Sequence, residues 1–95
     1  MQKYRNASQR LTIQFFQIEA DLYQQMTQLV VSQFQLEPVG EPASGPQERF
    51  QEFQHQRKVI SLEWDFWSGY TVVAKTESAE NLVRKIAAYI QQHHS

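Results

Sequence analysis

Apolar and polar residues alternate through residues 58–76, and this alternation predicts a β-hairpin. Side chains along a strand point to opposite faces in turn, so residues two apart share a face. The apolar face carries Ile60, Leu62, Trp64 and Phe66 on the first arm and Tyr70, Val72 and Ala74 on the second. The opposite face carries Ser61, Glu63, Asp65, Thr71, Val73 and Lys75. We expect the first face in the core and the second against solvent.

The loop of this hairpin is expected to contain three residues, Trp67-Ser68-Gly69. That length pairs Phe66 with Tyr70 and brings both apolar sets to one face, whereas a two-residue loop would separate them. The other expected pairs are Trp64 with Val72 and Leu62 with Ala74. Three-residue loops end on a residue in the left-handed region, which glycine adopts without strain. Gly69 fits that position, and Trp67 is then the aromatic at the tip.

Helical spacing marks two further segments. Glu19 and Asp21 are acids placed where a helix begins, and the apolar stripe that follows is Leu22, Met26, Leu29, Val30 and Phe34. This helix should end before Pro38. A second helix should begin at Ser78 as its N-cap. Its apolar stripe is Ala79, Leu82, Val83, Ile86, Ala87 and Ile90.

The remaining segments carry weaker signals. Residues 11–15 alternate as a short strand. Residues 1–10 are polar and are expected to be frayed, and residues 39–47, rich in proline and glycine, are expected to form a mobile loop. Residues 47–56 fit either a helix, from the spacing of Phe50 and Phe53, or a strand that joins the hairpin. The strand is favoured, with a bulge or an edge position accommodating the two Phe residues.

These elements predict an α+β protein of one domain, residues 1–95. The order is β-α-β-β-β-α, and the architecture is a two-layer sandwich in which an antiparallel sheet of about four strands carries both helices on one face. No apolar run reaches the length of a membrane span, and residues 1–4 lead into no signal-type apolar region. We therefore expect a cytoplasmic protein that does not bind membranes.

Composition excludes several kinds of chemistry. The chain has no cysteine, which removes disulfides, thiolate catalysis and thiolate metal sites. His55 stands alone, and His93 and His94 are adjacent on a helix, so their side chains point about 100° apart. We expect no metal site and no cofactor. Ser68 lacks the G-x-S-x-G context of a nucleophile.

Glu63 and Asp65 are the best candidates for acid–base chemistry, because paired carboxylates can share that work when a cleft raises one pKa. On the predicted solvent face of the sheet, however, they are expected to be solvated. The sequence therefore predicts a protein that is not an enzyme.

Nucleic-acid binding is the alternative function, because aromatic side chains on a sheet can stack on bases. The element order is similar to that of double-stranded-RNA-binding domains, but the Gly- and Lys-rich start of that family's last helix is replaced here by residues 76–80, TESAE. The net charge of −1 also argues against it.

The function class that remains is a small interaction or regulatory protein. Trp67 is the large aromatic that alternation does not place inside, and exposed Trp is enriched at binding hot spots. With Glu63 and Asp65 on the solvent face, it defines the expected interaction surface. The expected partner is another protein, or a second copy bound through the hairpin tip or a sheet edge.

Overall fold

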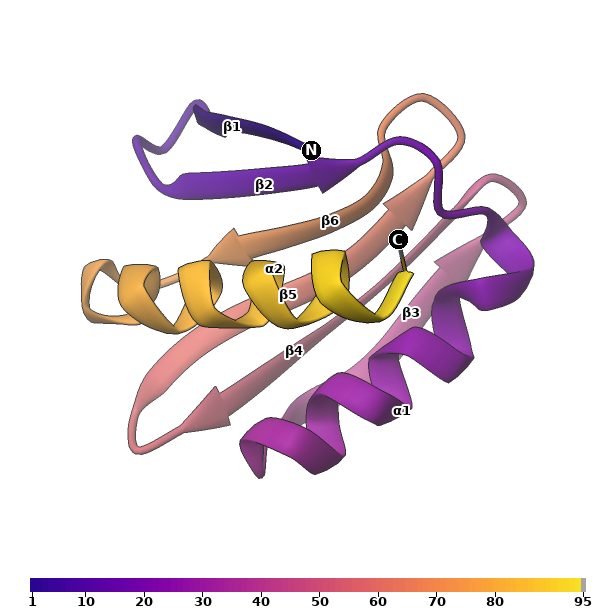
Figure 1. Cartoon of the computed structure of the whole chain (residues 1–95). Helices are drawn as coiled ribbons and strands as arrows, with labels where there is room; N and C mark the ends of the chain where they lie inside the picture. Colours follow the sequence, from indigo (N-terminus) through magenta and orange to yellow (C-terminus); the bar gives the residue numbers. More distant parts are fainter. Residues whose placement is uncertain (95) are drawn as a thin grey trace.

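The computed structural model describes residues 1–94, and it confirms the α+β class (Figure 1). Within that range the strands are β1 (Gln2–Arg5), β2 (Leu11–Phe15), β3 (Glu37–Gly45), β4 (Glu48–His55), β5 (Lys58–Asp65) and β6 (Gly69–Ala74). The helices are α1 (Tyr23–Phe34) and α2 (Glu80–His94), preceded by the 3₁₀ turns η1 (Ala20–Leu22) and η2 (Glu77–Ala79). None of these helices is long and apolar enough to cross a membrane.

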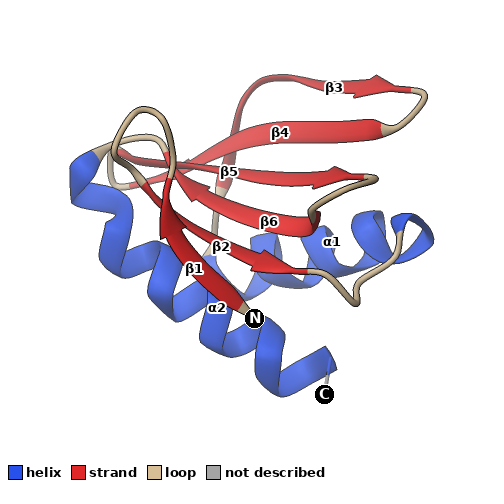
Figure 2. Cartoon of the chain, turned by 90° about the horizontal axis from the view of Figure 1, so that it is seen from above, coloured by secondary structure: helices blue, strands red, loops and turns tan. Residues whose placement is uncertain are grey.

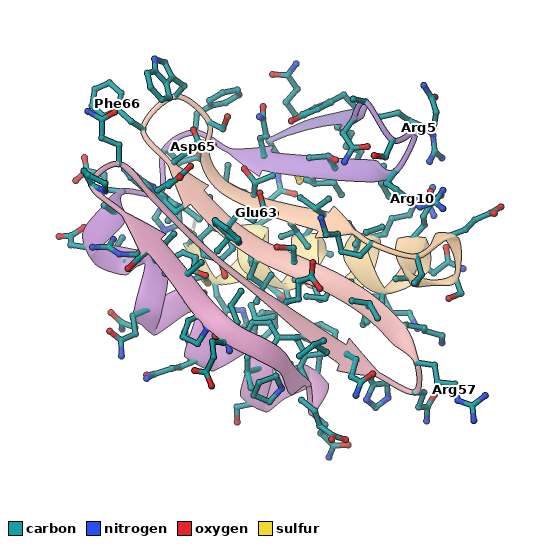
Figure 3. The ribbon with its side chains drawn as sticks, turned by 180° about the vertical axis from the view of Figure 1, so that it is seen from behind. Arg5, Arg10, Arg57, Glu63, Asp65 and Phe66 are labelled. Carbon is teal, nitrogen blue, oxygen red and sulfur yellow. The ribbon has the colours of Figure 1, made fainter. Side chains whose placement is uncertain are left out.

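The molecule has two layers, a sheet and a pair of helices on one side of it (Figures 1 and 2). The strand order is β1-β2-β6-β5-β4-β3, and every neighbouring pair is antiparallel. Within residues 1–94 no helix lies over the other face, which Figure 3 shows and which we call the open face.

The sheet has six strands in the described part of the chain, not about four. The two extra strands lie at its edges. Residues 2–5, expected to be frayed, form β1 and pair with β2. Most of the segment expected to be a mobile loop belongs to β3, which pairs with β4 on both sides of a bulge between Val39 and Ala43. The strand expected over residues 47–56 is confirmed as β4. The β4–β5 pairing has no bulge, so Phe53 faces the core and Phe50 the open face.

The β5–β6 hairpin keeps the predicted alternation from Ile60 to Asp65 but not the predicted pairs. Ser61, Thr71 and Val73, expected against solvent, are buried although they belong to the open face. Asp65 pairs with Gly69, and Trp64 pairs with Tyr70, so the three-residue loop is Phe66-Trp67-Ser68. The cause is Asp65, whose Oδ1 accepts hydrogen bonds from the backbone N–H of Trp67 (2.9 Å) and Ser68 (2.7 Å). An aspartate in this position stabilises a turn directly after itself. Phe66, expected in the core, is consequently placed in the loop.

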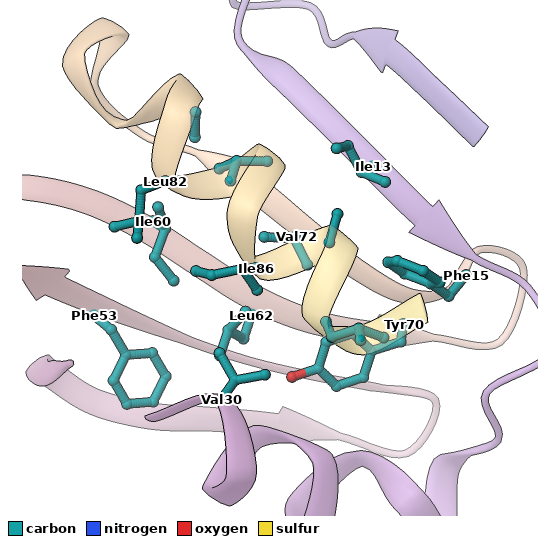
Figure 4. Packing of buried hydrophobic residues seen from close by; sticks show 14 of the residues in the cluster. Ile13, Phe15, Val30, Phe53, Ile60, Leu62, Tyr70, Val72, Leu82 and Ile86 are labelled. Atoms are coloured by element: carbon teal, nitrogen blue, oxygen red, sulfur yellow. The ribbon is translucent and has the colours of Figure 1, made fainter. Parts of the chain in front are cut away.

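The core lies between the sheet and both helices (Figure 4). The stripe predicted for α2 is confirmed, since all six of its residues are buried. Ser78 is not the N-cap of α2, because it lies inside the 3₁₀ turn η2, whose own N-cap is Thr76.

On α1, Leu29 is exposed, and the helix contacts the sheet through Tyr23, Met26, Thr27 and Val30. Two polar side chains of this face are satisfied inside: Tyr23 donates to the Leu62 carbonyl (2.7 Å), and Thr27 bonds the Tyr70 hydroxyl (2.7 Å).

Candidate interaction surface at the hairpin tip

The loop between β5 and β6 exposes two aromatic rings side by side. Trp67 is 75% exposed and Phe66 66% exposed, and the rings meet edge to face with centroids 5.8 Å apart. The turn that carries the rings is ordered, because Asp65 accepts the amides of Trp67 and Ser68 and the amide of Phe66 donates to the Gln47 carbonyl. A preordered aromatic pair loses little conformational entropy when a partner covers it.

Phe16, at the end of the neighbouring strand β2, is a third exposed aromatic residue. It follows the last residue of β2, is 53% exposed, and lies where the backbone of Gly69 comes close to that of β2. On the other side, the Phe66 N–H donates to the carbonyl of Gln47 in the β3–β4 turn (3.1 Å). We call Phe16, Phe66 and Trp67 the tip patch. The sequence analysis predicted Trp67 at this surface but neither Phe residue. Alternation assigned Phe66 to the core, and Phe16 lies just after the predicted strand over residues 11–15, where alternation makes no prediction.

Carboxylates surround the tip patch. Asp65 begins the loop, Glu48 pairs with it on β4, and Glu63 lies two residues before it on the open face. The labelled arginines lie at the opposite end of the sheet: Arg5 and Arg10 flank the β1–β2 turn, and Arg57 lies in the β4–β5 turn (Figure 3). Three carboxylates thus lie beside the tip patch, whereas Arg10 and Arg57 lie at the far end, where Arg5 is paired with Glu80.

The open face is hollowed beside the tip, where side chains of β1, β2, β5 and β6 meet. This hollow has a volume of about 250 Å³ and is lined by Tyr4, Thr12, Glu63, Asp65, Thr71 and Lys75 among others. We call it the open-face hollow. It brings together the two predicted carboxylates, Glu63 and Asp65. Trp67 does not line it, so the three predicted site residues form two adjoining surfaces.

The electrostatics of the hollow are visible at Tyr4. Burial raises the pKa of its phenol, and the negative charges of Asp65 and Glu63 raise this pKa further. Its hydroxyl also accepts a hydrogen bond from the Gln14 side chain (3.0 Å). The carboxylates thus act across the hollow on a group of another strand.

A larger groove lies between α1 and the β3–β4 edge, on the helix side of the sheet. Its volume is about 680 Å³, within the range of small-molecule sites. Apolar walls come from Tyr23, Val31, Pro38, Ala43 and Phe53, and polar groups come mainly from Gln24, Gln28 and Arg49. Arg49 donates to the Ala20 carbonyl (3.2 Å). The sequence analysis did not predict this groove, because the residues of β3 that line it, among them Pro38, Pro42 and Ala43, were not predicted to form a strand.

The histidines do not converge. The Nδ1 atom of His55 lies 3.3 Å from the Gln35 carbonyl, and that of His93 lies 3.0 Å from the Tyr89 carbonyl one helical turn earlier. Among residues 1–94, no three His, Cys, Asp or Glu side chains gather in a way that could hold a metal ion.

Comparison with known proteins places the chain in no family. No protein-family model matches it, and no curated protein or solved structure matches it significantly. The function must therefore be argued from the tip patch and its surroundings.

Proposed function

We propose that this chain is a small non-enzymatic interaction protein that binds a protein partner through the tip patch. The observation that carries the proposal is the exposure of three neighbouring aromatic residues at one end of the molecule. Exposed aromatic residues grouped on a rigid turn are the usual anchors of protein interfaces.

The surroundings of the patch indicate the chemistry of the partner. Because Glu48, Glu63 and Asp65 flank the aromatic rings, the complementary surface is an apolar pocket with lysine or arginine at its rim. A symmetric tip-to-tip dimer would bring these carboxylates face to face, which disfavours a second copy as the occupant. The edge strand β3 is also a poor docking site, since it carries Pro38, Pro42 and a bulge.

Nucleic acid fits the same surface poorly. The acids beside the tip repel phosphate, and two of the aromatics that could stack on bases are occupied: Tyr70 is buried, and the Trp64 indole N–H donates to the Ile18 carbonyl (2.9 Å). Binding to single-stranded RNA at low salt would favour the alternative function.

The decisive variants are Trp67→Ala and Phe66→Ala, with Leu29→Ala as the matched control. Leu29 is an exposed apolar residue on α1, away from the tip. The immobilised wild-type protein should retain a partner that both tip variants lose and that Leu29→Ala keeps. Equal retention of that partner by the tip variants and the control would contradict the proposal.

Stability measurements separate binding from folding. Trp67→Ala should leave the free energy of unfolding within about 0.5 kcal/mol of wild type, because the residue is mostly in solvent. Trp64→Phe should cost about 1 kcal/mol, because it removes the indole hydrogen bond to the Ile18 carbonyl. A large loss of stability in Trp67→Ala with unchanged association would assign the residue to folding instead.

A further inference from the structure

The open-face hollow is a small concavity that has room for a side-chain head group. Its volume of about 250 Å³ is below the range of sites for whole small molecules. Four strands contribute to it, together with Asn6 of the β1–β2 turn and Ser68 of the β5–β6 loop.

Its two carboxylates have no cation of their own. In the part of the chain that the structure describes, the ion pairs are Arg5–Glu80 and Lys75–Glu52, and neither Glu63 nor Asp65 takes part in one. Lys75 also lines the hollow, but its Nζ lies 3.8 Å from the carboxylate of Glu52. Asp65 uses Oδ1 for the turn amides, and Oδ2 accepts no hydrogen bond from residues 1–94.

A buried hydroxyl in the wall of the hollow is also unpartnered. Thr71 is 6% exposed, pairs with Glu63 across β5 and β6, and lines the hollow. Its Oγ1 atom has no hydrogen-bond partner within residues 1–94. Such an atom costs free energy unless something bonds it. A positively charged N–H donor would satisfy both the unpartnered hydroxyl of Thr71 and the neighbouring carboxylate.

We infer that the open-face hollow is a subsite for one organic cation, the ammonium of a lysine or the guanidinium of an arginine. The head group would donate to the carboxylates of Glu63 and Asp65 and, once the Thr71 side chain rotates toward the hollow, to its Oγ1, which is covered in the structure. An organic cation suits this set better than a metal ion, because no third His, Cys, Asp or Glu side chain of residues 1–94 joins the two carboxylates to hold a metal.

The inference rests on the proposed function in one respect, the source of the cation. Asp65 belongs to both surfaces, since it holds the tip loop through Oδ1 and lines the hollow. A partner seated on Phe66 and Trp67 therefore brings a basic residue at the rim of its pocket to the mouth of the hollow.

The test uses isolated head groups and needs no partner. We would titrate the ¹⁵N-labelled protein at low salt with N-acetyl-arginine and N-acetyl-lysine methylamides, and record amide shifts by NMR. N-acetyl-norleucine and N-acetyl-glutamate methylamides are the neutral and anionic controls. The cationic probes alone should give saturable shifts at Glu63, Thr71 and Tyr4.

Variants locate the bonds that hold the probe. Glu63→Gln and Thr71→Val should each weaken binding by about tenfold, because the first removes a negative charge that faces the cation and the second removes a hydroxyl acceptor. Glu41→Gln, an exposed carboxylate on the edge strand β3, should bind as wild type. The inference is overturned if the cationic probes give no saturable shift, if the neutral probe gives the same shifts, or if Glu63→Gln binds as wild type.

This outcome is independent of the tip experiment. If the probes bind in the hollow but no partner depends on Trp67, the subsite stands and the proposed function fails. If a partner depends on Trp67 but the probes do not bind, the proposed function stands and the cation subsite fails.

Discussion

Two buried threonines, Thr27 and Thr71, differ in whether their hydroxyls are bonded. Thr27 on α1 bonds the Tyr70 hydroxyl at 2.7 Å, whereas Thr71 on β6 has no partner in the described chain. Both side chains are almost completely buried. Replacement by valine, which has the same shape, therefore tests the hydrogen bond in one case and its absence in the other.

The two substitutions should change stability in opposite directions. Thr27→Val should cost about 1–3 kcal/mol, because it leaves the Tyr70 hydroxyl buried without a partner. Thr71→Val should gain up to about 1 kcal/mol, because it removes an unpaired polar atom. Urea unfolding of both variants beside wild type measures the difference. A loss of stability in Thr71→Val would mean that its hydroxyl is bonded in solution.

Two glycines offer a second matched comparison, since Gly69 (φ +69°) and Gly40 (φ +76°) share a left-handed backbone. At Gly69, an added Cβ would lie 2.9 Å from the Cα of Phe16 and closer still to the carbonyl of Phe15, whereas at Gly40 it would meet nothing within 4 Å. Gly69→Ala should therefore cost about 2–5 kcal/mol from strain and overlap together. Gly40→Ala should cost only about 1 kcal/mol from strain.

Thermal unfolding of the two alanine variants gives the comparison directly. The Gly69 variant should also disturb the β2–β6 pairing, visible as faster amide exchange at Phe15 and Tyr70. Equal losses at the two positions would show that the close approach of β2 to Gly69 is absent in solution.

The β5–β6 hairpin shows how far the positions of single residues can be predicted from the sequence. The face of every hairpin residue from Ile60 to Asp65 followed from alternation, because an error of two residues in register leaves parity unchanged. The predicted loop was one residue too late along the chain, because the prediction considered Gly69 as a turn residue and did not consider Asp65. An aspartate that accepts the amides two and three residues later is a turn signal of its own. That signal would have placed Phe66 outside and revealed most of the tip patch.

At the scale of elements, the sequence failed at the sheet edges. β1 (QKYR) is exposed at all four residues, and β3 (EPVGEPASG) has no buried residue. An edge strand without a buried face has no hydrophobic periodicity to detect, and proline is tolerated there because one row of amides needs no partner. The central strands and both helices were found because each has a face in the core.

The hollow was unpredictable for the same reason. Glu63, Asp65 and Thr71 could be assigned to the open face from parity alone. Its outer wall includes Tyr4 of β1, the strand that the pattern did not show. Without β1, the two carboxylates appear on a flat, solvated surface, which is why they were expected to be inert.

The position of β1 depends on a contact with the helix layer. Arg5, its last residue, forms a two-pronged ion pair with Glu80 at the start of α2, with Nη2 and Oε1 3.1 Å apart. The guanidinium lowers the pKa of the Glu80 carboxyl. Since Arg5 is exposed, the pair should hold an edge in place more than it stabilises the whole fold.

Breaking this pair should therefore loosen one strand. In Arg5→Ala, we expect faster amide exchange in Gln2–Arg5 and little change in Tm. Lys3→Ala, which removes a neighbouring charge without a carboxylate partner in the described residues, is the control. Because β1 carries Tyr4, loosening it should also weaken cationic probes at the hollow. Unchanged exchange in β1 would show that its pairing with β2 is sufficient alone.

At the scale of the whole molecule, the two layers are joined by buried tyrosines. Tyr70, fully buried on β6, bonds Thr27 of α1, and Tyr23 of α1 bonds a carbonyl of β5. The two rings are tilted against each other with centroids 5.5 Å apart. Burial raises the pKa of both phenols, and for Tyr70 the hydrogen bond with Thr27 offsets part of that rise. The junction between helix and sheet thus requires neutral phenols.

This requirement predicts alkaline unfolding with a defined sign. A folded-state pKa above the unfolded value of about 10 means that the unfolded chain loses its proton first. The stabilisation is fully present below pH about 10 and is lost as the pH rises through the folded-state pKa. Each buried phenol adds a slope of at most about 1.4 kcal/mol per pH unit. Urea unfolding between pH 8 and 11 measures that slope.

Tyr70→Phe separates this effect from the deprotonation of lysines in the same range. The variant should be less stable at pH 8, because Thr27 loses its partner, but its stability should fall less steeply above pH 10 than that of wild type. Phenolate absorbance should appear together with unfolding for the buried tyrosines. An unchanged slope in Tyr70→Phe would show that this phenol titrates alike in both states, and that the interior at the helix–sheet junction is open to water.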